Sequence, residues 1–266
     1  MRYHWATGTG FYSPQEGVPA IALPIPAGRA GLVPARRERG FVMADHRPRV
    51  STDHVLVAIR DLADAARRFA TVYGLRALPG GRHPGVGTAN MIVPLGSAYL
   101  EFIAVVDPEE AQRSPTTRRI TRAIEEGRTF ATWAVRTENL DALRDHLRGA
   151  GLDLAPPVAG ARERPDGVTI RWRTQLLVPP GEASVLPFVI EWQVPPEQHP
   201  ARAAVDHPSR ARGIRTVRLG DPDPAAASAR FRALLGDDPS VVVDRAATSG
   251  VLAVELDAPD GVLTIS

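Results

Sequence analysis

The sequence predicts an α+β fold in which tandem βαβββ modules form a cupped mixed sheet, with a third partial module at the C-terminus. Three observations indicate this fold. A pattern of a strand, a capped helix and further strands occurs twice, each copy closes on a strand that carries a glutamate, and a weaker copy follows. The first copy runs from Asp53 to Phe102 and the second from Thr132 to Trp192. Repeated strands of this kind pair into one sheet, so equivalent residues of both copies should reach the same cleft.

The chain divides into three regions. Residues 1–48 are rich in Pro, Gly and Arg and have no sustained period, which is typical of a disordered leader. Met43 is an alternative translation start, and most of this leader would then not belong to the protein. Residues 49–200 hold the paired modules. Residues 201–266 hold the third module, which is expected to cover a sheet edge or to contact another subunit.

The first strand of copy one has two different faces. Its residues alternate, so the face that carries Val55 and Val57 is expected to pack against a helix. The other face, which carries His54 and Leu56, is expected to point inward. A chemically active residue of this strand should therefore be His54.

Local signals delimit the remaining elements of copy one. Asp61 is placed to cap a helix, and Gly74 is placed to end it in the left-handed conformation. The segments 88–95 and 98–106 predict a β-hairpin. The Gly-rich segment before the hairpin, Gly81-Arg82-His83-Pro84, predicts a loop.

A short helix should connect the two copies, with Ser114 as its N-cap and Gly127 beyond its end. In copy two, the polar segment 155–167 predicts a long loop that can act as a lid. The expected elements of copy two are a strand at 130–136, a helix at 140–148 and strands at 168–177 and 185–194. Those of the third copy are a strand at 213–219, a helix at 224–235 and strands at 241–243, 251–256 and 262–265.

Composition excludes several function classes. The chain has no cysteine, and all 32 of its basic residues are arginine, which excludes thiolate nucleophiles, sulfur ligands and lysine Schiff bases. The formal net charge of +2 is small and the basic residues are interleaved with acidic ones, so no nucleic acid partner is expected. No apolar run is long enough to span a membrane and no secretory signal is visible, which predicts a cytoplasmic protein. A small-molecule ligand is the expected partner, and a homodimer stays open.

Symmetry between the copies predicts a polar centre. His54 lies eight residues before Leu62, and Thr132 lies eight residues before Leu140, so His54 and Thr132 are expected at equivalent positions of the two copies. Glu101 and Glu191 are expected to be equivalent as well. A centre with His54, Glu101 and Glu191 suits a divalent metal such as Zn²⁺, Fe²⁺, Mn²⁺, Co²⁺ or Ni²⁺, with one glutamate free to act as a catalytic base. The alternative is a hydrogen-bonded core histidine with ion-paired carboxylates.

A family resemblance rests on several short motifs, each weak alone. With these motifs, the chain resembles the glyoxalase-like domain group of bacterial proteins in the vicinal oxygen chelate (glyoxalase/bleomycin resistance/dioxygenase) superfamily. Thr132 departs from the pattern of glyoxalase I, which presents a fourth protein ligand, so a lactoylglutathione lyase is not predicted. The motifs are Asp53-His54, Gly81-Arg82-His83-Pro84, Gly87-Thr88-Ala89-Asn90, Tyr99-Leu100-Glu101, Trp133-Ala134-Val135-Arg136, Arg164-Pro165-Asp166-Gly167, Arg171-Trp172-Arg173 and Pro187-Phe188-Val189-Ile190-Glu191-Trp192.

The resemblance implies paired modules with the site inside the cup, and it leaves two functions open. The first is a metal-dependent isomerase, lyase or dioxygenase for a small substrate that chelates through neighbouring oxygens. Arg82 or Arg136 would orient an anionic group of that substrate. The second is a metal-free protein that binds and sequesters a small molecule, with Trp133, Trp172 and Trp192 as stacking surfaces. The substrate-binding candidates are Arg82, Asn90, Arg136 and Trp172.

Overall fold

The structure is a computed structural model that describes residues 48–114, 117–164, 166–179 and 182–266. The described residues all belong to one compact unit. The predicted leader, Met43 included, lies outside the described residues apart from its last position. The described residues therefore cover most of the two predicted modules and the C-terminal region.

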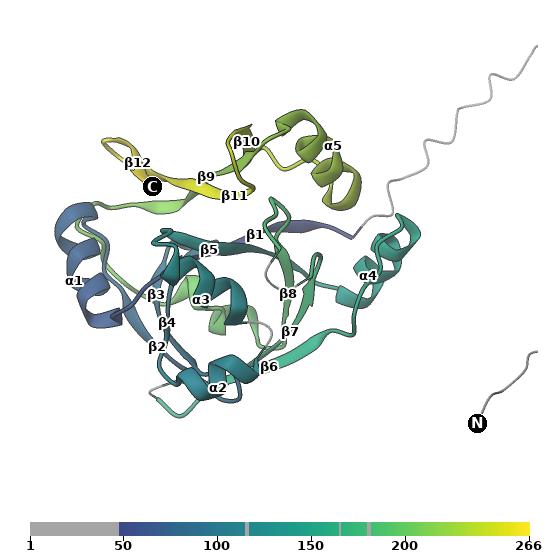
Figure 1. Ribbon diagram of the computed structural model, residues 1–266. Helices are drawn as coiled ribbons and strands as arrows, with labels where there is room; N and C mark the ends of the chain where they lie inside the picture. Colours follow the sequence, from purple (N-terminus) through teal and green to yellow (C-terminus); the bar gives the residue numbers. More distant parts are fainter. Residues whose placement is uncertain (1–47, 115–116, 165, 180–181) are drawn as a thin grey trace, which may run out of the picture. The chain divides into compact units, whose positions relative to one another are not determined.

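The larger sheet has eight strands in the order β2-β3-β4-β1-β5-β8-β7-β6. β1 and β5 pair antiparallel at its centre, and each lies parallel to the last strand of its own module, β4 or β8. Figure 1 shows this sheet curling on itself, which confirms the predicted cupped mixed sheet of two modules. The strands are β1 (Val50–Ala58), β2 (Leu78–His83), β3 (Thr88–Pro94), β4 (Tyr99–Val105), β5 (Phe130–Thr137), β6 (Val158–Glu163), β7 (Thr169–Leu176) and β8 (Phe188–Trp192).

Equivalent helices follow the first strand of each module. α1 (Leu62–Tyr73) is capped by Asp61, whose carboxylate accepts from the Asp64 N–H, and Gly74 ends it with φ 61°. α4 (Leu140–Gly149) is capped in the same way by Asn139, which accepts from the Ala142 N–H. The predicted caps at Asp61 and Gly74 are thus confirmed, because short polar side chains satisfy the free N–H groups of a first helical turn.

Among its described residues, the connection between the modules contains two α-helices where one helix was expected. They are α2 (Pro108–Arg113) and α3 (Arg118–Glu125). Asp107 caps α2 with its carboxylate, and Ser114 is the C-cap residue of that helix. The predicted cap at Ser114 precedes positions 115 and 116, which lie outside the described residues, so it stays a prediction, whereas the start signal of Asp107 and Pro108 that begins α2 was not predicted. No helix in the described part of the chain is long and apolar enough to cross a membrane.

Two segments predicted as loops are edge strands. β2 replaces the expected Gly-rich loop, and its glycines allow a close approach, since a side chain at Gly80 would collide with the Asn90 amide. β6 replaces the central part of the expected lid, and Gly160 lies against the Trp172 indole for the same reason. Glycine and polar residues suggest loops in a sequence, but at these positions they permit strand packing.

The two edge strands meet where the sheet curls around. A side chain at Gly81 would collide with the Glu163 carbonyl, so β2 and β6 lie against each other there. The buried Arg162 guanidinium donates to the Gly80 carbonyl across this junction. A hydrogen bond from a cation thus satisfies part of an otherwise unpaired strand edge and helps to close the cup.

A second sheet follows in the C-terminal region, with strand order β10-β9-β11-β12. The element order of the region repeats strand, helix and three strands, but β9 pairs parallel with β10, whereas β1 pairs parallel with β4. The helix α5 occupies the predicted residues and is capped by Asp223. The elements are β9 (Arg212–Asp221), α5 (Pro224–Leu235), β10 (Val241–Arg245), β11 (Gly250–Ala258) and β12 (Gly261–Ile265).

One apolar core joins the two sheets. Val55 on β1 and Trp133 on β5 belong to the same buried cluster as Phe231 on α5 and Val254 on β11. The Trp133 and Phe231 rings stack with centroids 5.9 Å apart, and the Trp133 indole donates to the Val185 carbonyl. Trp133 is therefore a core residue and not a stacking surface of the cup. The alternation predicted for the first strand is confirmed, since Val55 and Val57 face this core.

Shortening Phe231 to leucine is expected to lower the free energy of unfolding by about 1–2 kcal/mol, because buried apolar contact between the two sheets is lost. Urea unfolding followed by tryptophan fluorescence and by circular dichroism would measure the change. Both probes should shift together, since one core serves both sheets. Arg230→Ala, an exposed position on the same helix, is the matched control and should change the free energy by less than about 0.5 kcal/mol. Separate transitions for the two probes would contradict a shared core.

Candidate functional site

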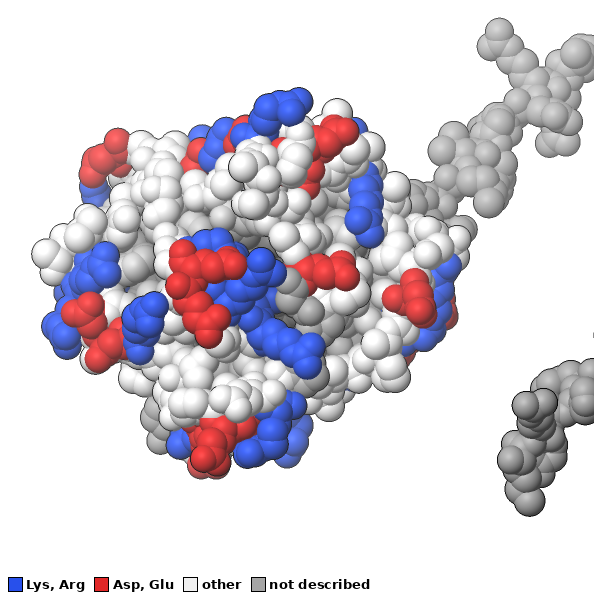
Figure 2. Space-filling model, viewed as in Figure 1, with Lys and Arg blue, Asp and Glu red and all other residues white. Residues whose placement is uncertain are grey.

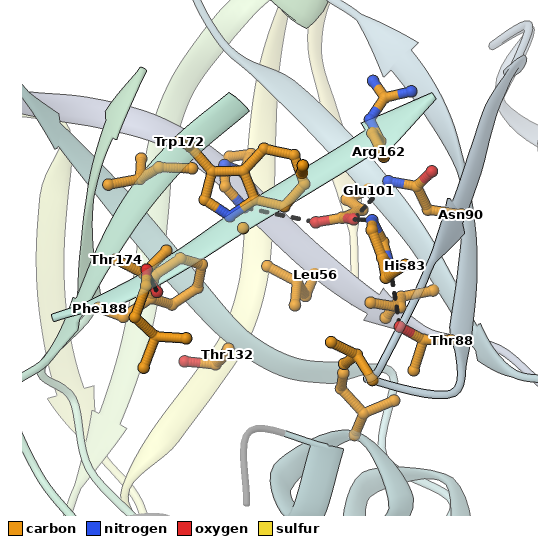
Figure 3. A pocket seen from close by; sticks show the side chains of 18 of the residues that line it. Leu56, His83, Thr88, Asn90, Glu101, Thr132, Arg162, Trp172, Thr174 and Phe188 are labelled. Atoms are coloured by element: carbon orange, nitrogen blue, oxygen red, sulfur yellow. Dashed lines mark hydrogen bonds and ion pairs between the residues drawn. The ribbon is translucent and has the colours of Figure 1, made fainter. Parts of the chain in front are cut away.

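The inner face of the curled sheet encloses a cavity of about 230 Å³. Its wall is mostly apolar, and polar side chains gather at one end around Glu101 (Figure 3). Both modules and the segment before β5 contribute to it. The lining includes His54, Leu56, His83, Thr88, Asn90, Tyr99, Glu101, Ile103, Arg119, Ile120, Thr132, Arg162, Trp172, Thr174, Phe188, Ile190 and Trp192.

The Glu101 carboxylate is the centre of the polar end. It accepts a 2.6 Å hydrogen bond from the Asn90 amide on Oε1, and its Oε2 lies 3.4 Å from His54 Nε2. Its Oε1 lies 4.0 Å from His83 Nε2. Figure 3 shows Asn90 and His83 pointing toward Glu101 from neighbouring strands. Because Glu101 is only 6% exposed, these groups replace water as its partners.

A fully buried carboxylate, Asp53, lies behind His54. His54 Nδ1 lies 2.6 Å and His199 Nε2 2.9 Å from its oxygens, and the Trp192 indole donates to it at 3.2 Å. Although burial raises the pKa of Asp53, hydrogen bonds and charge from His199 and His54 outweigh burial and hold its pKa well below the usual range. An ionised Asp53 fixes the His54 tautomer with a proton on Nδ1, so Nε2 is the nitrogen that faces Glu101.

Two neighbours on one strand reach each other here because the strand is irregular. The pairing of β1 with β5 shifts register between Thr52 and His54, which places a bulge at Asp53. A bulge re-aims a side chain that would otherwise point to the opposite face. Asp53 and His54 can thus form a hydrogen-bonded pair although they are consecutive.

His83 on β2 is a neutral member of the polar end. Burial lowers its pKa, against a raising effect from the Glu101 charge. Its Nδ1 lies 2.9 Å from the Thr88 hydroxyl, which can donate to it. The neutral ring then carries its proton on Nε2, the tautomer that the Glu101 carboxylate favours. His83 can therefore offer a hydrogen bond into the cavity without a change of charge.

Aromatic side chains form much of the remaining wall. Tyr99 stacks on His54 with ring centroids 4.6 Å apart, and burial raises its pKa well above the usual value, so it stays neutral. Phe188 lies against His54 edge-on at 5.5 Å. Trp172 and Trp192 pack on each other at 5.6 Å. This wall excludes water from the polar end and offers stacking surface to an apolar ligand.

The structure brings four of the predicted site residues to the cavity, namely His54, Glu101, Asn90 and Trp172, together with Thr132. It places two others away from it. Arg82 is exposed, and its nearest acidic partner is Asp107 at 4.0 Å. Arg136 donates to the Ser97 carbonyl at 2.7 Å and lies 3.5 Å from Asp53, so it supports the strand and not a ligand.

Glu191 does not face the cavity, in contrast to the orientation expected from symmetry. It accepts from the Leu140 N–H at 2.9 Å and from Arg173 Nε at 2.7 Å, so it anchors α4 to β7 on the outer face. The predicted equivalence of Glu101 and Glu191 is wrong, because their strands are offset by three positions. Glu101 pairs with Leu56, six residues before α1, whereas the residue six before α4 pairs with Phe188. Glu191 is three positions beyond Phe188, and an odd offset turns a strand residue to the other face.

The donor set does not fit the predicted metal centre. Phe188 and Thr132 stand where the second module would have to supply ligands equivalent to Glu101 and His54. His83 Nε2 lies 4.0 Å from Glu101, more than the roughly 3.0–3.4 Å between atoms that share a metal at about 2.1 Å. Among the described residues, no group of three His, Asp or Glu side chains is arranged to hold a metal ion.

Sequence reasoning missed several functional neighbours of the cavity. Asp53 and His199 form the buried support of His54, and His83 belongs to an unpredicted strand. Arg162 and Arg119 line the cavity although each lies outside the predicted motif positions. The adjacent pair Asp53-His54 was the one signal in the sequence that pointed to an oriented imidazole. The other contacts depend on curling of the sheet.

The fold and the cavity define a class of protein, in which paired βαβββ modules enclose a site of small-molecule size. The chain matches the sequence profile of a glyoxalase-like domain over residues 52–235. It therefore belongs to the glyoxalase-like domain family, within the vicinal oxygen chelate superfamily. No curated protein matches the chain.

One solved structure shares the fold at low sequence identity, and others are similar over about half of the chain. A hypothetical protein from Staphylococcus aureus has a TM-score of 0.64 and 14% identity, over 82% of this chain and 99% of that one. Methylmalonyl-CoA epimerase from Streptomyces coelicolor, in complex with 2-nitronate-propionyl-CoA, gives a TM-score of 0.41 and 17% identity over 54% of this chain and 97% of that one. The epimerase from Mycobacterium tuberculosis gives 0.39 and 20% over 55% and 89%.

Proposed function

We propose that the protein is an acid–base enzyme, of the isomerase or lyase type, that enolises a small carbonyl compound. The observation that carries the proposal is the buried chain of Asp53, His54 and Glu101, with separations of 2.6 and 3.4 Å, which opens onto the cavity. Paired acid and base groups of this kind serve proton transfer. Asn90 fixes the Glu101 carboxylate, and Asp53 fixes the His54 ring.

The proposed chemistry moves two protons. The Glu101 carboxylate removes a proton from the carbon next to the substrate carbonyl. His54 reacts in its doubly protonated form, in which Nδ1–H donates to the ionised Asp53 and the Nε2 proton passes to the carbonyl oxygen. The product of these transfers is a neutral enol. Return of the proton held by Glu101 to carbon, and of the enol O–H proton to His54, completes an isomerisation and restores both groups. His83 Nε2–H faces Oε1 of Glu101, whereas His54 faces Oε2. It can hydrogen-bond the carbonyl oxygen of the substrate as well.

A divalent metal takes no part in this proposal, because the residues around the cavity do not fit one. The predicted set of His54, Glu101 and Glu191 is divided between the two faces of the sheet. Proton transfer by His54 and Glu101 requires only groups that the cavity wall supplies.

A second candidate function is a metal-free protein that binds and sequesters a small molecule. The aromatic wall of Tyr99, Trp172, Phe188 and Trp192 favours it, since it supplies stacking surface whether or not a reaction follows. The two candidates agree on the ligand site and differ on turnover.

Deuterium exchange separates them. Small ketones are incubated with the protein in D₂O, exchange at the carbon next to the carbonyl is followed by ¹H NMR, and binding is followed by quenching of tryptophan fluorescence. We expect catalysed exchange, and we expect His54→Gln to slow it about 100-fold, since a glutamine amide can still hydrogen-bond the oxygen but cannot protonate it. His146→Gln, on α4 outside the cavity, is the control.

Binding without exchange would overturn the enzyme proposal in favour of sequestration. An unchanged rate in His54→Gln would remove His54 from the reaction. Chelator, and then Zn²⁺, Fe²⁺, Mn²⁺ or Ni²⁺, should leave the exchange rate within about twofold. A rate that depends on one of these ions would contradict the metal-free mechanism.

A further inference from the structure

Arg119 on α3 lines the cavity with a guanidinium whose hydrogen bonds are incomplete. Nη1 donates to the Thr132 hydroxyl and Nη2 to the Pro179 carbonyl, each at the long distance of 3.4 Å. Its Nε is buried and has no hydrogen-bond partner within the described part of the chain. A guanidinium has five N–H donors, and a buried donor without a partner is costly.

The electrostatic surroundings of Arg119 leave its charge largely unpaired. Burial lowers the pKa of the guanidinium, and the Glu182 charge acts in the opposite direction. No ion pair within 4.0 Å joins Arg119 to Glu182 or to another carboxylate of the described residues. An anion beside Arg119 would supply the missing acceptors and stabilise its charge.

The register of the sheet fixes where such an anion would lie. Leu56 on β1 pairs with Glu101 on one side and with Thr132 on the other, and all three line the cavity. Figure 3 shows Leu56 between Glu101 and Thr132. Two strand spacings separate the acid–base group from Thr132, which is roughly 10 Å between Cα atoms. The side chains at both ends extend into the cavity, so the distance between the acid–base group and Arg119 corresponds to the length of a small molecule.

We infer that Arg119 and Thr132 bind a carboxylate of the substrate, and that the substrate is an oxo acid whose ketone lies a few carbons from that carboxylate. The inference rests on the proposed function, to which it adds the substrate class. The carboxylate accepts from the Arg119 guanidinium and the Thr132 hydroxyl, and the ketone reaches His54 and Glu101 over Leu56. An apolar substituent on the ketone lies against the aromatic wall.

The surface around α3 agrees with an anionic ligand. The helix carries Arg118, Arg119 and Arg122 among its eight residues, and Arg122 forms an ion pair with Glu126. Figure 2 shows basic side chains gathered over α3, with acidic ones beside them. A local excess of positive charge near the end of the cavity that holds Arg119 would attract a small anion toward it.

The test compares a carboxylate with its neutral counterpart. The probe is 4-oxo-4-phenylbutanoate, which carries a carboxylate, a ketone with an exchangeable CH₂ and an aromatic ring, and the counterpart is its methyl ester. Dissociation constants come from tryptophan fluorescence. We expect the acid to bind more tightly than the ester, and Arg119→Ala to weaken binding of the acid about 10- to 100-fold with little effect on the ester. Arg119→Lys should retain part of the preference.

Arg118→Ala is the matched control, since Arg118 is exposed, adjacent in sequence and outside the cavity. An equal loss for acid and ester in Arg119→Ala would indicate damage to the cavity and overturn the inference. No preference for the acid in the unmodified protein would overturn it as well. Deuterium exchange is measured on the same samples. If deuterium exchange occurs but the preference for the acid does not depend on Arg119, the proposed anion site is wrong and the proposed enzyme is not. If the preference depends on Arg119 but no exchange occurs, the proposed enzyme is wrong and the anion site is not.

Discussion

Replacing Asp53 with asparagine is expected to lower the free energy of unfolding by about 3–5 kcal/mol. The carboxylate is fully buried, and it accepts hydrogen bonds from His54, His199 and Trp192. An asparagine of the same shape removes the charge and offers only one acceptor oxygen, so at least one of these buried donors loses its partner. Urea unfolding at pH 7 measures the difference.

The loss should depend on pH in a defined direction. The pKa of Asp53 is depressed in the folded protein relative to its ordinary value of 3.8, so the carboxylate stabilises the fold fully above that value. This stabilisation is lost as the pH falls below about 4 toward the lowered pKa of the native state. The difference between the unmodified protein and Asp53→Asn should therefore shrink as the pH falls below about 4.

Asp64→Asn is the matched control, because Asp64 is exposed on α1 and pairs with the exposed Arg67. It should change the free energy of unfolding by less than about 0.5 kcal/mol. If Asp53→Asn were as mild as this control, Asp53 would not be the anchor of the polar end. The same variant should also slow deuterium exchange, since an asparagine no longer stabilises a protonated His54.

The sequence predicted more of the fold than of the site, because most elements of the fold follow from local patterns, whereas the site depends on how distant strands pair. Caps at Asp61 and Gly74 and the alternation of Val55 with His54 are local signals, and each is confirmed in the structure. The strands β2 and β6 were predicted as loops, since their glycines and polar residues serve packing that only the curled sheet reveals. Local pattern is thus a good guide to elements that face the core, and a poor one to strands at the sheet edges.

The site depended on register, which the sequence shows only approximately. His54 and Thr132 were aligned through the helices that follow them, and both line the cavity. Glu101 and Glu191 were aligned because their strands resemble each other. That alignment is wrong by three positions, and Glu191 lies on the outer face of the sheet. Residues such as Arg119 reach the cavity from a connecting helix, so no repeat or alternation could have indicated them.

Replacing Glu101 with glutamine is expected to slow deuterium exchange about 1,000-fold while the fold and ligand binding are retained. A glutamine has the shape of glutamate and can still accept the hydrogen bond from Asn90, so the cavity should keep its form. It cannot take up a proton from carbon at neutral pH. The loss should therefore exceed that of His54→Gln, in which the substitute amide still hydrogen-bonds the substrate oxygen.

The measurement pairs the exchange rate with the dissociation constant for the same ketone. Glu109→Gln, an exposed glutamate on α2, is the control and should leave both unchanged. A variant that binds the ketone normally and exchanges at more than about a tenth of the original rate would show that another group removes the proton. A preference for the carboxylate probe that survives in Glu101→Gln would show that Arg119 acts independently of the base. The two ends of the cavity would then have separate roles, one in recognition and one in proton transfer.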